Sequence, residues 1–277
     1  MVSLMAATTA PYRSWNHRCH NCFPAWPECP IFALVLGHRL VIVQDAHLGP
    51  DSPEREEAFL AFLEAVPTLG DCLLVNGDLF EFWAEYRRVV PRTGFHVVAA
   101  LARLRKRIPV VMTGGNHDRW GETFWQGDLG IEFFPYQARL EIGRRGVLAL
   151  HGDGITERSR GARLLHRVTK LPLTVTLFRL LHPDLVFWLT DRLSGALGDT
   201  TRDPEVIRQA AEQQQQWAIR TLAADPTLGL VVMGHTHRPA LAEPEPGRQY
   251  LNPGAWLDGY CYAVATEDGA QLCQFPR

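Results

Sequence analysis

The sequence of 277 residues lacks several features that define large classes of proteins. It has no apolar stretch of the roughly 18 to 20 residues that a membrane-spanning helix needs. Its first residues lack the basic head and apolar segment of a secretory signal. It has no internal repeat, and its only low-complexity tract is the glutamine run 213–216. These absences favour a cytoplasmic globular protein.

A general excess of positive charge is also missing, because 28 Lys and Arg face 30 Asp and Glu and the formal net charge is −2. We therefore expect no specific nucleic-acid partner, and a DNA repair nuclease is disfavoured. The charge is nevertheless uneven, since residues 87–179 hold seventeen Lys or Arg and seven Asp or Glu. That excess suits an anionic ligand. The length and the 46% hydrophobic residues are enough for one large α/β domain.

Cysteine is sparse, and three of the six cysteines lie within the first thirty residues. With two histidines nearby they offer one CxxC pair, Cys19 and Cys22, whereas a structural zinc site needs two ligand pairs. We interpret residues 1–32 as a poorly ordered extension, with zinc binding as the open alternative. The domain itself is predicted to span residues 33–277.

Five apolar runs of strand length end in polar residues that can bind metals or transfer protons. The runs are RLVIVQDAHLG, DCLLVNGDLFEFW, IPVVMTGGNHD, GVLALHGDG and LGLVVMGHTHRP. Helix-like segments at 52–66, with Ser52 as N-cap and Pro53 in the first turn, and at 94–107 separate the first three runs. Strands that are apolar throughout are covered on both faces, and ligands collect outside their carboxyl ends. The sequence thus predicts an α/β fold whose polar clusters share one sheet edge.

Residues of about 155–225 interrupt this alternation. They are rich in leucine and arginine, and they include a helix that is capped by Asp203 and stopped at Pro226. We interpret them as a helical insertion, or lid, over the strand ends; the alternative is a helical pair packed on the core with a solvated arginine face. The sequence after them alternates like antiparallel edge strands with a turn at Asp268 and Gly269.

The strand exits supply two carboxylates, four imidazoles and one amide oxygen, from Asp45, His47, Asp78, Asn116, His151, His235 and His237. A single histidine near a strand end is usually a hydrogen-bonded structural residue, but seven such residues at five strand ends are too many for that interpretation. They are also too many for one ion, and they match two divalent cations that share a bridging anion, for which Asp78 is the natural choice. Mixed nitrogen and oxygen ligands without thiolate favour Mn²⁺, our first choice, or Fe or Zn²⁺ over Mg²⁺ or Ca²⁺.

The blocks DAHLG, GDLFE, GGNHD, HGD and GHTH, in this order over residues 45–237, resemble the five motifs of the calcineurin-like metallophosphoesterases. The resemblance implies a four-layer α/β/β/α sandwich with a two-metal centre. It assigns Asp45, His47, Asp78 and His237 to one metal and Asp78, Asn116, His151 and His235 to the other. It makes His117 and Asp118 a catalytic pair beside the metals.

The chemistry that this implies is in-line attack on phosphorus by a hydroxide that the two cations activate. Metal binding lowers the pKa of water from about 15.7 towards about 7, so such a hydroxide is available near neutral pH. We expect His117 to neutralise charge on the phosphoryl oxygens and to protonate the leaving oxygen, while Asp118 fixes its tautomer. No covalent enzyme intermediate is required.

Several segments resemble a narrower group, the UDP-2,3-diacylglucosamine pyrophosphatases of lipid A synthesis. They are the helical insertion, the C-terminal segment, NGDLFEFW and GHTHRPA. The resemblance implies cleavage of a UDP-sugar lipid to UMP and a lipid monophosphate at the inner face of the cytoplasmic membrane, with peripheral membrane contact through the insertion. We expect the diphosphate to be bound by Arg119, Arg160, Arg163 and Arg167.

The sequence departs from that narrower group at His117. The group carries Arg there, reading GNRD where this chain reads GNHD. The departure concerns the substrate and not the metal centre. Another phosphodiesterase or phosphomonoesterase therefore remains an alternative, and a non-catalytic scaffold of the same fold is a remoter one.

Overall fold

The computed structural model describes residues 34–118, 120–121, 123–155, 177–198 and 203–276. The expectations for residues 1–32 lie outside these ranges. The same is true of the arginines expected to bind substrate, Arg119, Arg160, Arg163 and Arg167.

The described chain forms two mixed six-stranded sheets. In sheet order, the first consists of β1 (Leu34–Gly37), β6 (Gln137–Ile142), β7 (Arg145–Leu150), β8 (Leu228–Val232), β10 (Arg248–Asn252) and β9 (Ala240–Glu245). The second consists of β12 (Ala270–Gln274), β11 (Cys261–Thr266), β2 (Arg39–Val43), β3 (Cys72–Asn76), β4 (Val110–Thr113) and β5 (Glu132–Phe134). The helical elements are α1 (Pro53–Leu69), α2 (Phe95–Leu104), η1 (Phe124–Asp128), α5 (Pro183–Gly198) and α6 (Pro204–Ala224).

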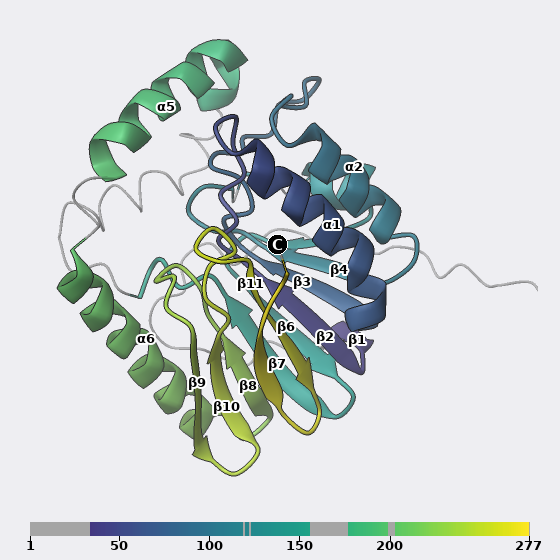
Figure 1. The fold of residues 1–277 in the computed structure, drawn as a ribbon, viewed down its shortest axis with the longest axis vertical. Helices are drawn as coiled ribbons and strands as arrows, with labels where there is room; N and C mark the ends of the chain where they lie inside the picture. Colours follow the sequence, from purple (N-terminus) through teal and green to yellow (C-terminus); the bar gives the residue numbers. More distant parts are fainter. Residues whose placement is uncertain (1–33, 119, 122, 156–176, 199–202, 277) are drawn as a thin grey trace, which may run out of the picture. The chain divides into compact units, whose positions relative to one another are not determined.

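Strand β2 shows how the layers arise, because its side chains alternate between two separate hydrophobic clusters. Val41 and Val43 pack in a cluster with the buried residues of α1 and α2, whereas Leu40 and Ile42 pack in a cluster between the two sheets. Side chains of a strand alternate between faces with period two, so a fully apolar strand serves two cores at once. Figure 1 shows α1 and α2 beside the second sheet and α6 beside the first.

Helix α6 corrects the expectation that all of residues 155–225 cover the strand ends. Its Ala218 and Leu222 pack in a third hydrophobic cluster with Val231 of β8 and Met233 just after it, so α6 forms an outer layer of the fold. Its predicted start is confirmed, because Asp203 Oδ1 accepts a hydrogen bond from the backbone N–H of Glu205 at 2.9 Å. The sequence predicted this helix but not the surface against which it packs.

The earlier part of the same stretch contributes α5 and the residues just before it. The Phe187 ring lies 5.3 Å from the Phe82 ring, and Arg179 Nε donates to the Glu85 carbonyl at 3.0 Å.

Among the described residues, none of the helices combines the length and apolarity needed to span a bilayer.

Two of the expected edge strands lie inside the sheets. Strand β10 pairs with β8 and β9, and β11 pairs with β2 and β12. The predicted turn at Asp268 and Gly269 does join β11 to β12, with Thr266 N–H donating to the Gly269 carbonyl at 2.8 Å. Each of these two strands thus has a partner strand on both sides.

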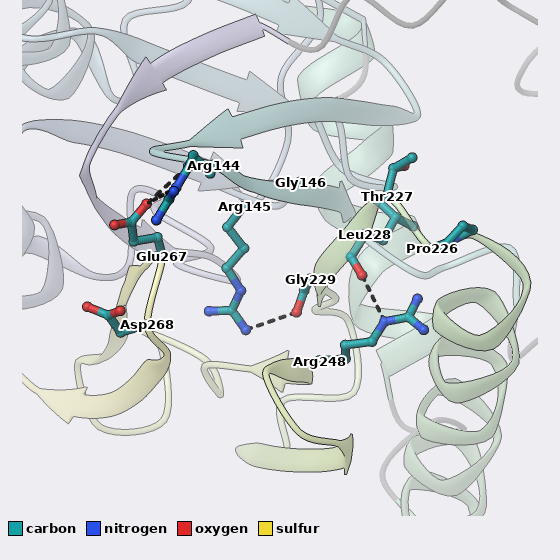
Figure 2. A pocket seen from close by; sticks show the side chains of 10 residues that line it. All are labelled: Arg144, Arg145, Gly146, Pro226, Thr227, Leu228, Gly229, Arg248, Glu267 and Asp268. Carbon is teal, nitrogen blue, oxygen red and sulfur yellow. Dashed lines mark hydrogen bonds and ion pairs between the residues drawn. The ribbon is translucent and has the colours of Figure 1, made fainter.

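At the amino ends of β7, β8 and β10 the sheets are tied together by a buried arginine. Arg145 is 5% exposed and donates to the carbonyls of Thr266 at 3.1 Å and Gly229 at 2.9 Å, and to Gln249 Oε1 at 2.9 Å. It lines a cavity of about 320 Å³ that also includes Arg144 and Arg248 (Figure 2). This end of the molecule is stabilised by structural hydrogen bonds, and the predicted site residues lie at the other ends of these strands.

Candidate metal centre

Five loops follow the carboxyl ends of β2, β3, β4, β7 and β8, as the sequence predicted, and polar side chains from them meet. Several of these residues have left-handed backbone conformations. The φ angles are positive at Asp45 (48°), His47 (44°), Asp78 (50°), His235 (69°) and His237 (55°). Such conformations cost free energy for residues other than glycine and cluster at functional sites. The loops are therefore shaped to direct these side chains together.

One group of possible ligands consists of Asp78, His151 and His235, whose ligand atoms lie within 4.8 Å of one another. His151 Nε2 lies 3.1 Å from Asp78 Oδ2 and 3.8 Å from Asp45 Oδ1. The rings of His151 and His235 have centroids 5.2 Å apart. The two histidines come from different strand ends, and both are held beside buried carboxylates.

A second group consists of Asp45, His47 and His237, again with ligand atoms within 4.8 Å. His237 Nε2 lies 3.7 Å from Asp45 Oδ1, and His47 Nε2 lies 3.7 Å from Asp78 Oδ2. Each carboxylate thus approaches a histidine of its own group and one of the other group. Two adjacent cation sites that share a carboxylate would have this arrangement.

Two buried nitrogen atoms test whether these residues fit a metal. Within the described residues, His47 Nε2 and His151 Nε2 are inaccessible to solvent and make no hydrogen bond of good geometry, although both lie within ion-pair distance of Asp78. A buried polar atom without a well-formed hydrogen bond costs free energy, and imidazole that has lost its proton is a common ligand of divalent transition metals. Cations placed between these nitrogens and the two aspartates would satisfy both, so the donor set fits the metals that the sequence implies.

The electrostatics of the cluster also favour a bound cation. Burial alone would raise the pKa of Asp78, but His151 and His117 hold the pKa of this carboxyl well below its usual value. Burial alone would lower the pKa of His151, but Asp78 and Asp45 raise it to about 10. Burial and the charge of His151 lower the pKa of His235 to about 4. The buried carboxylates therefore favour a positive charge beside them, which a bound cation would supply.

Asn116 differs from the other expected ligands. It lies in the loop after β4, beside the cluster in sequence, and its side chain is exposed. No hydrogen bond of this side chain is found within the described residues. The structure therefore brings six of the seven expected ligands together, and the exposed side chain of Asn116 is not among them.

The expected pair His117 and Asp118 is arranged differently from the prediction. His117 Nδ1 donates to the Glu81 carbonyl at 2.5 Å, which leaves Nε2 for the site, and its ring centroid lies 4.8 Å from that of His47. Asp118 accepts hydrogen bonds from the backbone N–H groups of Leu79 at 2.7 Å and of Asp78 at 3.2 Å. Glu81 thus fixes the His117 tautomer, and Asp118 holds the loop that carries Asp78.

Two carboxylates that the sequence did not single out orient the histidines from behind. Glu81 Oε2 lies 3.3 Å from His47 Nδ1, and Asp258 Oδ2 lies 3.1 Å from His237 Nδ1. A carboxylate on Nδ1 fixes the ring and leaves Nε2 for a metal. The sequence could have indicated Glu81 by its position three residues after Asp78 in GDLFE. Asp258 lies in a loop with no recognisable sequence pattern.

A family model and several hydrolases match most of this chain. The calcineurin-like phosphoesterase family model matches residues 38–239. UDP-2,3-diacylglucosamine hydrolase of Shewanella piezotolerans is 25% identical over 247 residues, covering 86% of this chain and 98% of the relative. The enzyme of that name from Enterobacter sp. (strain 638) is 25% identical over 254 residues, covering 85% of this chain and 98% of the relative. A solved phosphoesterase from E. coli, Yfce, is 15% identical, covers 86% of this chain and 100% of that chain, and has a TM-score of 0.39.

Proposed function

The chain belongs to the calcineurin-like phosphoesterase family and is a phosphoester hydrolase, and from this premise we propose that it cleaves the pyrophosphate of a UDP-sugar lipid. The products would be UMP and a lipid monophosphate. The observation that supports hydrolysis is the pair of ligand groups around Asp45 and Asp78. The substrate class is supported by the UDP-2,3-diacylglucosamine hydrolases that match over 98% of their own length.

Two divalent cations complete the proposed centre, with Mn²⁺ as the first choice and Fe or Zn²⁺ as alternatives. His47, His237 and Asp45 would hold one cation, and His151, His235 and Asp78 the other. When bound, such cations attract electrons from phosphoryl oxygens and lower the pKa of water towards neutrality. Within the part of the chain that the structure describes, the two groups consist of four imidazoles and two carboxylates, and this mixed nitrogen and oxygen set agrees with these metals.

The other side chains of the site have roles that follow from their contacts. His117 presents Nε2 to the site because Glu81 accepts the hydrogen bond from its Nδ1. In its protonated form, His117 donates from Nε2 to a phosphoryl oxygen or to the leaving oxygen. Glu81 and Asp258 keep His47 and His237 in the tautomer with Nε2 directed at the cluster. Asp118 keeps Asp78 in place through backbone hydrogen bonds.

A lipid substrate also requires a surface for its acyl chains. We propose that the protein works at the inner face of the cytoplasmic membrane and contacts it peripherally through the region of α5. Apolar side chains are exposed there, including Leu180 at 77%, Leu185 at 48% and Trp188 at 54%. A cluster of exposed apolar residues is a common sign of an interaction surface.

A second candidate function is hydrolysis of another phosphodiester or phosphomonoester. It is favoured by one residue, because His117 stands where the UDP-2,3-diacylglucosamine pyrophosphatases carry Arg. A histidine can act as a general acid, which arginine cannot do at neutral pH. The leaving group therefore distinguishes the two candidates.

The test is product analysis with purified protein and Mn²⁺. UDP-2,3-diacylglucosamine, an aryl phosphodiester and an aryl phosphomonoester are supplied in parallel, and Asp78→Asn is the inactive control of nearly equal shape. We expect UMP from the first substrate with the wild type and none with the variant. Turnover of an aryl ester without UMP release would favour the second candidate. Metal-loaded protein that hydrolyses none of the three would favour a non-catalytic scaffold.

A further inference from the structure

One glutamine of the run 213–216 lies in an unusual place. Gln214 is fully buried, whereas its neighbour Gln216 is exposed. Gln214 precedes Ala218 and Leu222 at helical spacing on the face of α6 that packs against the first sheet. Burying an amide at an otherwise apolar face costs free energy unless its polar atoms are paired. The contacts of this side chain therefore indicate why it is there.

Gln214 bridges the two loops that carry His151 and His235. Its Nε2 donates to the carbonyl of Gly234 at 3.1 Å and to that of Gly152 at 3.5 Å. Its Oε1 accepts from Thr236 Oγ1 at 3.3 Å. Gly152 follows His151 directly, and Gly234 and Thr236 lie on either side of His235. Both ends of one amide thus contact neighbours of two proposed ligands.

The backbone is adapted to this bridge. Gly152 has a φ of +104°, and the space that a Cβ would occupy there is filled by Gln214 Nε2. One direct backbone bond also links the loops, from Gly234 N–H to the His151 carbonyl at 2.9 Å. A glycine is required at this point because the glutamine approaches the backbone closely.

The contact continues into the core beneath the metal centre. Thr236 Oγ1 accepts from Asn252 Nδ2 at 3.1 Å, and Asn252 Oδ1 accepts from Gln44 Nε2 at 2.9 Å. Gln44 Oε1 in turn accepts from Asn76 Nδ2 at 2.9 Å, and the Asn76 carbonyl accepts from His151 Nδ1 at 3.2 Å. A buried polar network with its partners in place fixes a single arrangement of the groups it joins.

We propose that Gln214 is a positioning residue that sets the separation of His151 and His235, so that both can bind one cation. The proposal rests on the proposed metal centre and adds to it a residue from α6, which contributes no ligand of its own. Partners of metal ligands commonly change metal affinity by 10- to 100-fold when they are removed. The bridge predicts that loss of Gln214 weakens metal binding at one site.

The experiment titrates metal-free protein with Mn²⁺ and follows the free ion by electron paramagnetic resonance. Gln214→Met keeps length and helix propensity but removes all three hydrogen bonds. Gln216→Met, on the exposed face of the same helix, is the matched control. We expect two Mn²⁺ per wild-type chain, an affinity weakened roughly 10- to 100-fold at one site in Gln214→Met, and wild-type affinities in Gln216→Met. Thermal unfolding of the metal-free proteins is measured alongside.

The outcomes separate this role from the metal centre itself. A Gln214→Met protein that changes in thermal stability but binds two Mn²⁺ with wild-type affinities would overturn the role of Gln214 and leave the metal centre intact. A wild-type protein that binds no Mn²⁺ would overturn the metal centre and the role with it. If Gln214→Met does not fold, Thr236→Val removes the hydroxyl contact from the opposite side, with Thr236→Ser as the variant that restores affinity. Unchanged Mn²⁺ affinities in Thr236→Val would then overturn the role.

Discussion

Asp78 is fixed by contacts on both its backbone and its carboxylate. Its N–H donates to Asp118 Oδ1 at 3.2 Å, and its own Oδ1 accepts from the backbone N–H of His117 at 2.9 Å. Gly115 lies against the same carboxylate, so closely that a Cβ there would collide with Asp78 Oδ1 and the Asp78 backbone. The geometry of this one ligand therefore depends on a residue that has no side chain.

We expect Gly115→Ala to displace Asp78 and to lower kcat by roughly 10²-fold, which a misplacement of about 1 Å can cause. The crowding should also lower the free energy of unfolding by about 1–3 kcal/mol. Gly127→Ala is the control, since a Cβ at Gly127 meets nothing within 4 Å. Steady-state kinetics and urea unfolding of both variants check this. A wild-type kcat in Gly115→Ala would show that turnover does not depend on this position of the Asp78 carboxylate.

His117 can be tested apart from the metals. In His117→Ala we expect kcat to fall by roughly 10²- to 10⁴-fold, the usual contribution of a general acid. Metal content should stay at the wild-type value if the metals occupy the groups built on Asp45 and Asp78, which do not include His117; a third possible group, of His47, Glu81 and His117, would lose a ligand. Kinetics and elemental analysis are measured on the same preparation, with exposed His96→Ala as the control. Loss of a metal in His117→Ala would instead make His117 a ligand.

Residue types allowed most of the cluster to be predicted, because imidazole and carboxylate at strand exits are informative in the sequence itself. The orienting partners were not predictable in this way. Glu81 reaches His47 and His117 through different atoms, and Asp258 reaches His237 from a loop far along the chain. Those contacts depend on how the loops fold. The misassigned role of Asp118 has the same cause, since its partners are backbone groups.

At the scale of elements, apolar runs predicted β2, β3, β4, β7 and β8 and the loops that follow them. Short or exposed strands were not predicted, because β5 has only three residues and β9 is mostly exposed. The placement of α6 was wrong because periodicity shows that a helix has a buried face and not which sheet it covers. The burial of Gln214 was not predicted either, because one glutamine in a run of four has no distinguishing pattern.

The turn between β1 and β2 offers an element-scale test of pH dependence. Asp71, just before β3, accepts hydrogen bonds from the backbone N–H groups of His38 at 2.9 Å and Arg39 at 2.8 Å. Burial tends to raise the pKa of Asp71, but these bonds lower it below its usual value. A pKa that is lower in the folded state gives stability that is present above the ordinary value, about 3.9, and is lost as the pH falls.

We therefore expect wild type to exceed Asp71→Asn in free energy of unfolding by a constant amount between pH 7 and about pH 5. The difference should shrink as the pH falls below about 4, because protonation of Asp71 removes the charge that strengthens both hydrogen bonds. Urea unfolding of the two proteins at pH 7, 5, 4 and 3 measures it. A difference that stays constant down to pH 3 would show that the carboxylate charge has no part in holding this turn.

At the scale of the whole molecule, three hydrophobic clusters stabilise the layers. The proposed metal centre, in contrast, buries several ionisable side chains close together at one end of the sheets. Asp45, Asp78, Asp118 and His151 are each at most 1% exposed. Charged groups buried together cost free energy unless their partners balance them. Cations that bind only the folded chain should therefore increase its free energy of unfolding.

Adding Mn²⁺ to metal-free protein should consequently raise its melting temperature. A ligand at 100 times its dissociation constant stabilises by about 2.7 kcal/mol per site, which for a domain of this size is a shift of about 5–10 °C. The same concentration of Ca²⁺ should give a smaller shift, because it prefers oxygen ligands and four of the six clustered donors are imidazoles. Asp78→Asn should lose most of the Mn²⁺ shift, and a chelator should reverse it in the wild type. Equal shifts with Ca²⁺ and Mn²⁺, or an undiminished shift in Asp78→Asn, would mean that the cations bind somewhere other than this cluster.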